Sequence, residues 1–112
     1  MKIYHNSRCS KSRQGLHLLQ EAGASPDIID YIKNPLTTGE IKEILAKLDI
    51  PALDLVRKNE AIWKEKFKGK ELSEDEIIQA MSEYPKLIER PIVVKGNKAV
   101  IGRPPEKIKL LF

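Results

Sequence analysis

The sequence is poor in cysteine, histidine and aromatic residues, and these shortages exclude several classes of protein. One cysteine in 112 residues forbids an internal disulfide, so a disulfide-stapled secreted domain is excluded. One cysteine and two histidines, at positions 5 and 17, lack the spacing of a metal-ligand set, so we expect no metal. The chain also has no run of about 20 apolar residues to span a membrane, and no apolar signal-peptide core follows its first residues. We therefore expect a cytoplasmic protein with no membrane partner.

The sequence does contain enough apolar residues for one core, and an uneven distribution of charge. Hydrophobic residues make up 41% and charged residues 32% of the chain, which is typical of a single globular domain over residues 1–112. The net charge is +4. The first twenty residues contain no acidic side chain and four basic ones, Lys2, Arg8, Lys11 and Arg13. This excess forms no long basic stripe with aromatic residues, which argues against nucleic-acid binding and suits a small anion.

Strand and helix patterns alternate at the start of the chain. Residues 2–5 are typical of a short strand, residues 10–23 have leucines at helical spacing before Gly23, and residues 26–32 are typical of a second strand. A helix between two strands implies parallel pairing in a right-handed βαβ unit.

The end of the chain returns to strands. Residues 91–94 and 98–101 flank Gly96-Asn97, which predicts an antiparallel hairpin. Pro104 and Pro105 then precede a last helix through Leu111.

The middle of the chain is predicted to be helical. Thr37 with Glu40, and Ser73 with Glu76, match the capping box that begins a helix. Shorter helices are expected over residues 53–59 and 60–67, the second with Trp63 and Phe67 facing the core. The predicted order is therefore βαβ, a helical block, then ββα.

Cys9 stands where the first strand gives way to the first helix. The free amides and the positive dipole end of a helix N-terminus stabilise a thiolate and also bind oxyanions. Arg8, Lys11, Arg13 and also His5 are expected to act in the same direction. A lone cysteine is commonly a small buried apolar residue, but the neighbours here are serines and basic residues, which favours a reactive thiol. Phosphatases with a cysteine nucleophile have five residues between this cysteine and an arginine. Here the corresponding position is Gly15, so this class of enzyme is excluded.

Four blocks of the sequence, in order, resemble the glutaredoxin-linked arsenate reductases of the ArsC family and their close relatives. These blocks are IYHNSRCSKSR, LVRKN, ERPIVV and IGRPPE, and they lie at residues 3–13, 55–59, 89–94 and 101–106. The resemblance implies an α/β fold with a thioredoxin/glutaredoxin-like core. The core would comprise residues 1–34 and 87–112, with a helical insertion over residues 35–86.

The resemblance also implies roles for individual residues. Cys9 matches the nucleophile that attacks arsenate, and His5 matches a residue that helps to keep this cysteine ionised. Pro91 stands where thioredoxin folds carry a cis-proline beside the active site. Guanidinium groups suit tetrahedral oxyanions, and substrate binding is expected of five residues: Arg57, Arg90, Arg103, Ser10 and Arg13.

A single thiol constrains the expected mechanism. Once Cys9 carries an adduct, an external thiol must resolve it, because Ser12 stands where a dithiol motif has its second cysteine. The resemblance implies that glutathione attacks the adduct as co-substrate and that glutaredoxin reduces the resulting mixed disulfide. We expect no bound cofactor, and we expect a monomer.

Two other functions fit the same fold. Some proteins with this fold are regulators or adaptors that bind RNA polymerase under thiol stress, but they sense it with a C-x-x-C pair that is absent here. A general glutathione-dependent thiol reductase is the third possibility. The chain carries Ser7 and Ser10 where characterised arsenate reductases carry Pro and Gly, and it ends at Phe112 without their C-terminal tail, so it looks closer to a shorter branch of the family.

Overall fold

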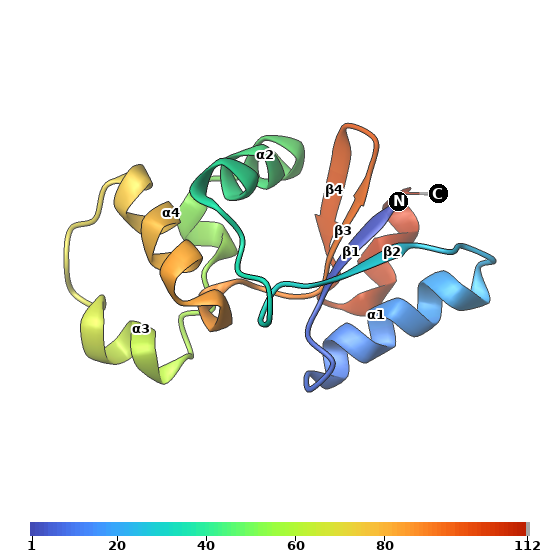
Figure 1. Ribbon diagram of the computed structural model, residues 1–112, viewed down its shortest axis with the longest axis horizontal. Coiled ribbons are helices and arrows are strands. Elements are labelled where there is room, and N and C mark those ends of the chain that lie inside the picture. The colour runs from blue at the N-terminus through green and yellow to red at the C-terminus, as the bar shows by residue number, and fades with distance from the viewer. Residues whose placement is uncertain (112) are drawn as a thin grey trace. The chain divides into compact units, whose positions relative to one another are not determined.

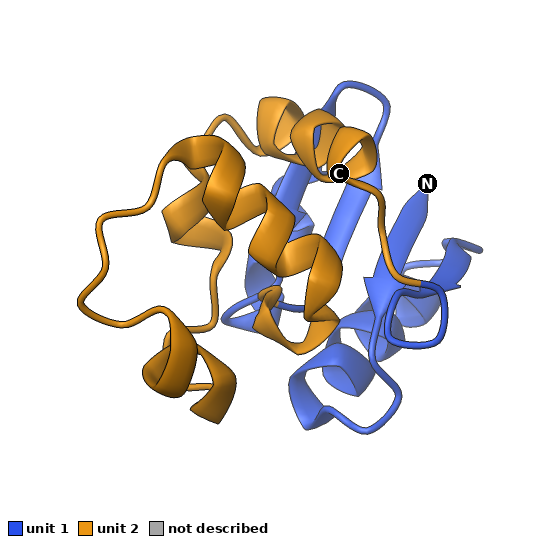
Figure 2. Ribbon diagram, turned by 60° about the vertical axis from the view of Figure 1, so that its left-hand side comes forward, with its two compact units in different colours: residues 1–34, 90–112 blue, residues 35–89 orange. Residues whose placement is uncertain are grey.

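The structure is a computed structural model that describes residues 1–111. These residues divide into two units, shown in different colours in Figure 2. Unit 1 combines residues 1–34 with the chain from Arg90 onward, and unit 2 comprises residues 35–89. Phe112, the last residue of the predicted core, lies outside the described residues. No helix within residues 1–111 is both long enough and apolar enough to cross a membrane.

Unit 1 is built on a four-stranded sheet whose strand order is β2-β1-β3-β4 (Figure 1). β1 pairs with β2 in parallel and with β3 antiparallel, and β3 pairs antiparallel with β4. The strands are β1 (Lys2–His5), β2 (Asp27–Asp30), β3 (Ile92–Lys95) and β4 (Lys98–Ile101). The predicted parallel βαβ unit and the hairpin around Gly96-Asn97 are therefore confirmed, and so is the α/β fold class.

Two helices pack against this sheet and against each other. They are α1 (Ser10–Glu21) and the 3-10 helix η3 (Pro105–Leu111). Their buried side chains form one apolar cluster with the sheet: Ile3, Leu19, Val93, Ile108 and Leu111. The last helix was expected from its sequence, but it is of the tighter 3-10 type, because the hydrogen bond from Lys107 N to Pro104 O spans three residues.

β2 is shorter than the pattern of residues 26–32 predicts. The Asp30 carboxylate accepts hydrogen bonds from the backbone N–H groups of Ile32 and Lys33, each at 3.1 Å. This Asx turn ends the strand at Asp30. Tyr31 therefore occupies the first position after the strand, at the edge of the sheet where β1 also ends.

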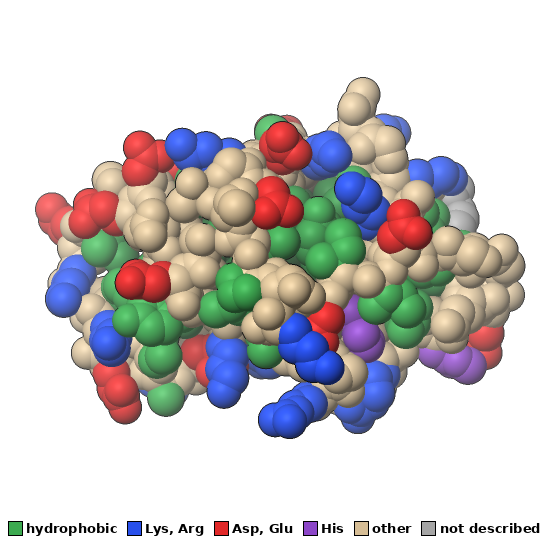
Figure 3. All heavy atoms as spheres, in the orientation of Figure 1, with side chains coloured by type: hydrophobic (Ala, Val, Ile, Leu, Met, Phe, Trp, Pro, Cys, Tyr) green, Lys and Arg blue, Asp and Glu red, His purple; other side chains and the backbone are tan. Residues whose placement is uncertain are grey.

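Unit 2 is helical, and local capping signals begin its main helices. The Thr37 and Ser73 side chains accept hydrogen bonds from the N–H groups of Glu40 and Glu76, which confirms both predicted capping boxes. α2 packs against α4, and acidic and basic side chains are interspersed on the visible surface of unit 2 (Figure 3). The elements are α2 (Thr38–Leu48), η1 (Ala52–Leu55), α3 (Ala61–Lys66), α4 (Glu74–Glu83) and η2 (Pro85–Leu87).

The predicted helix over residues 53–59 is wrong beyond Leu55. Val56 instead forms an antiparallel bridge with Ile88, and Glu89 N donates to Leu55 O at 2.8 Å. This short ladder holds residues 87–89 to the helices of unit 2. The boundary between the units consequently falls after Glu89 and not after residue 86.

Candidate active site

The single thiol stands at the N-cap of α1. The loop after β1 closes with a hydrogen bond of 3.0 Å from Cys9 N to Asn6 O, and Cys9 O accepts the first helical bond from Arg13 N at 3.1 Å. The backbone of Cys9 is extended, with φ −97° and ψ 124°. The side chain therefore lies at the helix start, beside amides that have no partner within the helix.

Donors from both halves of unit 1 converge on the Cys9 sulfur. The Arg103 Nη2 group lies 3.5 Å from Sγ. Burial raises the pKa of Cys9, but hydrogen bonds from the Ser12 N–H, the Arg90 side chain and the Lys11 N–H, together with the Arg90 charge, outweigh it, so the net pKa is lowered. A larger fraction of the thiol is consequently ionised at neutral pH than in an ordinary cysteine.

The two arginines are held in place by the backbone around them. Arg103 Nε donates to the carbonyl oxygen of Arg90 at 2.7 Å, and the Arg90 side chain is buried. The Arg90–Pro91 and Arg103–Pro104 peptide bonds are both cis. A guanidinium fixed by its own hydrogen bond loses little conformational freedom when it binds an anion.

Pro91 lies between two glycines that allow close approach. A Cβ built on Gly15 of α1 would stand 2.7 Å from Pro91 Cγ, and one on Gly102 would stand 3.0 Å from the same atom. Both glycines are buried. The helix that begins at Cys9 is thereby packed directly on the proline that follows Arg90.

His5 does not supply the positive charge that the sequence led us to expect. Burial is the main cause that lowers the pKa of His5, and Arg13 acts in the same direction, against the Asp30 charge and the Ser12 backbone. The imidazole is therefore mainly neutral at pH 7. It lies at the end of β1, and its Nδ1 atom is buried without a hydrogen-bond partner among residues 1–111.

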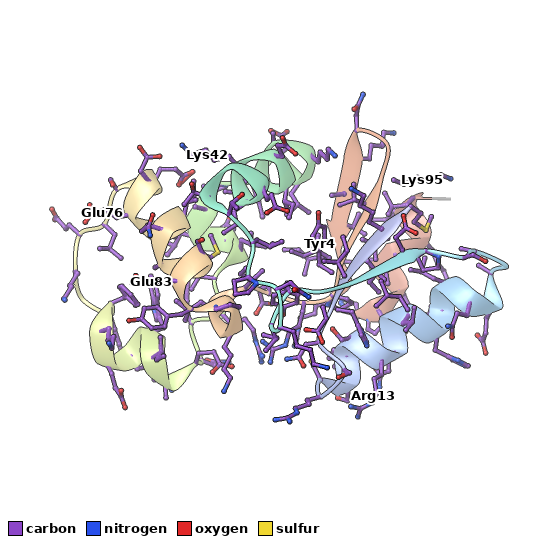
Figure 4. All side chains as sticks on the ribbon, viewed as in Figure 1. Tyr4, Arg13, Lys42, Glu76, Glu83 and Lys95 are labelled. Atoms are coloured by element: carbon purple, nitrogen blue, oxygen red, sulfur yellow. The ribbon has the colours of Figure 1, made fainter. Side chains whose placement is uncertain are left out.

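Side chains next to the thiol support its loop. Ser12 is buried, and its Oγ accepts a hydrogen bond of 3.2 Å from Asn6 N. Arg13, on the first turn of α1 in Figure 4, donates from Nη1 to Ser7 O at 2.8 Å. Ser10 is exposed at the first helical position, and the amides that lower the pKa of Cys9 belong to the next two residues. Arg13 therefore stabilises the loop between β1 and α1.

Arg57 belongs to unit 2, unlike the other predicted site residues. Its Nη1 lies 3.4 Å from a Glu60 carboxylate oxygen, and its Nε lies 3.3 Å from a Glu89 carboxylate oxygen. Its backbone N–H donates to Leu87 O at 2.7 Å. The structure brings together Cys9, Arg90 and Arg103 within unit 1, and the part of Arg57 in oxyanion binding stays a prediction.

Sequence reasoning missed Tyr31. Its side chain is completely buried, and burial raises its pKa. The charges of Arg90 and Arg103 and a hydrogen bond from the Arg90 side chain oppose this rise, while the Cys9 thiolate acts in the same direction as burial. The available signal was its place just beyond a strand parallel to β1, since the carboxyl ends of parallel strands share one sheet edge. The residue was instead assigned to the strand itself.

The chemistry available to this arrangement is nucleophilic attack by a stabilised thiolate on an anion held by guanidinium groups. Within the part of the chain that the structure describes, no three side chains of the metal-binding types His, Cys, Asp and Glu are grouped to hold a metal ion.

Comparison with known proteins identifies the family. The ArsC family matches residues 4–111 of this chain. The chain belongs to the ArsC family. An arsenate reductase of Haemophilus influenzae is 42% identical to it over 108 residues, which are 95% of this chain and 93% of the relative. The uncharacterized protein YfgD of Escherichia coli is 46% identical over 110 residues, 96% of this chain and 92% of the relative.

Solved structures agree with this membership. The arsenate reductase from Vibrio cholerae superposes on the ArsC-family chain with a TM-score of 0.96 at 41% identity, covering 99% of this chain and 96% of the other. The resemblance inferred from four sequence blocks is therefore confirmed, together with the thioredoxin-like α/β fold.

Proposed function

We propose that this ArsC-family protein reduces arsenate to arsenite, with Cys9 as the nucleophile and with glutathione and glutaredoxin as external reductants. The observation that supports it most is a thiol of lowered pKa with the Arg103 guanidinium 3.5 Å from its sulfur. Relatives that cover nearly the whole chain are named arsenate reductases, which favours arsenate as the anion.

In the first step, the Cys9 thiolate attacks the arsenic atom of arsenate. A sulfur–arsenic bond forms, and one arsenate oxygen leaves as water after it is protonated. Arg90 and Arg103 hold the oxyanion and stabilise the negative charge that shifts onto its oxygens. Arsenic remains As(V) in this adduct.

The second step needs a thiol from outside the protein. The thiolate of glutathione attacks the Cys9 sulfur of the adduct and forms a disulfide with it. The sulfur–arsenic bond breaks, its electron pair stays on arsenic, and arsenite leaves as As(III). Each sulfur gives one of the two electrons, so the sum is arsenate plus two thiols giving arsenite, a disulfide and water. Because Cys9 is the only cysteine, we propose that glutaredoxin then reduces the mixed disulfide by thiol exchange.

The test is arsenite production from arsenate with glutathione, glutaredoxin and their reducing system. We expect turnover by the native protein, loss of turnover to background in Cys9→Ser, and a single turnover when glutaredoxin is omitted. Lys98→Ala, which removes an exposed charge on β4, serves as a control that keeps full activity. A folded native protein without turnover, or an active Cys9→Ser variant, would contradict the proposed function.

The same assay separates the other two functions expected from the fold. A general thiol reductase would reduce a glutathione mixed disulfide at a rate that does not depend on any oxyanion. A regulator of transcription would leave arsenate unreduced and would bind RNA polymerase stably.

A further inference from the structure

We infer, on the basis of the proposed function, that the Tyr31 hydroxyl is an additional hydrogen-bonding group for the oxyanion held beside Cys9. Neither the motif blocks of the sequence nor the mechanism above gives this residue a part. Tyr31 lies directly after the end of β2, is completely buried, and is surrounded by the charged groups of the thiol site.

Topology places Tyr31 at the edge of the sheet where α1 begins. β1 and β2 are parallel with His5 opposite Asp30, so the residue after Asp30 lies level with the start of the loop that leads to Cys9. The Asp30 side chain fixes the turn by accepting the N–H groups of Ile32 and Lys33. The backbone of Tyr31 is therefore held on both sides.

The Tyr31 hydroxyl is buried, and its proton has no acceptor. The residue is 0% exposed, and its oxygen has no partner at strict hydrogen-bond geometry among residues 1–111. The Arg90 side chain acts on the hydroxyl as a hydrogen-bond donor, and a guanidinium group cannot accept the hydroxyl proton. Buried hydroxyl groups in folded proteins almost always have a partner, because an unpaired one costs free energy. An exception in a native protein calls for an explanation, and a catalytic role or a bound ion is among the known ones.

The charges around this hydroxyl are those of the thiol site. Arg90, Arg103 and Cys9 all lie near enough to act on its pKa, which burial raises, so the hydroxyl stays protonated throughout the working pH range. The Cys9 sulfur already has other donors, from Arg90, Arg103 and the amides of Lys11 and Ser12. The thiolate therefore does not need the Tyr31 hydroxyl, and an oxyanion bound by the same arginines brings acceptor oxygens next to it.

A neutral hydroxyl adds something that the arginines do not have. Guanidinium groups only donate hydrogen bonds, whereas a tyrosine hydroxyl both donates and accepts. Tyr31 can thus pair with a bare oxygen of the oxyanion or with one that carries a proton.

The experiment compares Tyr31→Phe with the native protein, since phenylalanine keeps the ring and removes only the hydroxyl. Cys9 is alkylated with iodoacetamide at increasing arsenate concentrations, and the concentration that gives half protection is measured. We expect it to rise about ten- to a hundredfold in Tyr31→Phe, the loss of one hydrogen bond to a charged acceptor. Without arsenate, the alkylation rate and the unfolding temperature are expected to stay at or above the native values, because the lost O–H group donates to no acceptor in the ligand-free protein.

A matched control is Tyr84→Phe, which removes a hydroxyl that accepts a hydrogen bond from Lys66 in unit 2. Its half-protection concentration is expected to equal the native one. Unchanged protection in Tyr31→Phe would overturn the inference, as would a native protein that arsenate does not protect. A lower unfolding temperature of Tyr31→Phe without arsenate would also overturn it, by showing a structural partner for the hydroxyl.

Failure of the proposed function gives a different result. A native protein that is protected by arsenate but produces no arsenite contradicts arsenate reduction, and the shift in Tyr31→Phe then still supports the inference. Turnover by the native protein with unshifted protection in Tyr31→Phe contradicts the inference alone.

Discussion

At the residue scale, the Cys9 thiol is governed by two opposing effects. Burial favours the neutral thiol, while the backbone amides of Lys11 and Ser12 and the guanidinium groups favour the thiolate. Several donors together stabilise the thiolate, so the loss of one donor changes the ionisation of the thiol without abolishing it.

Arg103→Ala is expected to raise the pKa of Cys9, because a cation within hydrogen-bond reach of the sulfur is lost. The measurement is the alkylation rate of Cys9 with iodoacetamide as a function of pH, whose midpoint moves upward. Arg103→Lys keeps a positive charge, and its alkylation midpoint is expected to lie between those of the native protein and Arg103→Ala. An unmoved midpoint in Arg103→Ala would show that the contact of 3.5 Å has no electrostatic effect.

The buried imidazole of His5 makes stability depend on pH in a defined direction. Its pKa in the folded protein lies below the ordinary value of 6.5, so the unfolded chain takes up the proton first as pH falls. The contribution of His5 to stability is thus full above pH 6.5 and is lost as pH falls from there toward the folded-state pKa. We expect the native protein to lose more free energy of unfolding than His5→Gln over this window, measured by urea denaturation. Parallel curves for the two proteins would contradict a neutral His5.

Some of these residue properties were accessible from the sequence, and others were not. The place of Cys9 at a helix start follows from local strand and helix patterns. The neutral state of His5 depends on burial that outweighs the opposing charge of Asp30, which β-sheet pairing brings opposite it. The position of Tyr31 could not be predicted for a similar reason. The Asx turn that ends β2 two residues before the expected end depends on the conformation of one side chain, that of Asp30.

At the scale of elements, the packing of α1 against Pro91 depends on the absence of a side chain at Gly15. Pro91 Cγ would stand 2.7 Å from an added Cβ, and Ile108 Cδ1 would stand 3.0 Å from it. A proline ring cannot rotate away as a flexible side chain can. The helix itself must therefore move to accept any larger residue.

Gly15→Ala is expected to destabilise the protein by about 1–3 kcal/mol through overpacking, despite the better helix propensity of alanine. Gly39→Ala in α2 is the matched control, since its nearest atom would be Thr37 Oγ1 at 3.9 Å, and it is expected to be neutral or up to about 1 kcal/mol more stable. Urea denaturation measures both. Equal stability of the two variants would mean that α1 shifts at no cost.

The elements predicted best are those that local chemistry decides. Both capping boxes were read correctly because the four residues that form each one are adjacent in sequence. The stretch after Leu55 was misread as helix, because its true partner is Ile88, more than thirty residues away. The 3-10 type of the last helix likewise depended on Pro104 and Pro105, which lack the N–H group that a backbone hydrogen bond needs.

At the scale of the whole molecule, a ligand that binds only the folded chain shifts the unfolding equilibrium. A ligand at one hundred times its dissociation constant stabilises the folded state by about 2.7 kcal/mol. For a chain of this size, this corresponds to a rise of roughly 10 °C in Tm.

We therefore expect arsenate to raise the Tm of the native protein with the logarithm of its concentration. Arg90→Ala is expected to lose most of this rise relative to its own arsenate-free Tm, while Lys98→Ala keeps it. The measurement is thermal unfolding followed by circular dichroism. A full rise in Arg90→Ala would remove this arginine from the oxyanion site.

Ser12 fills the position of a second thiol with a buried hydroxyl that ties the loop to Asn6. In consequence, oxidation of Cys9 cannot produce a disulfide within the chain. Under the proposed function, a turnover that loses its reductant leaves glutathione or another group attached to Cys9, and this adduct is heavier than the reduced protein. An intact-mass spectrum of protein taken directly from cells would therefore identify, by the size of that increment, the last compound with which the thiol reacted.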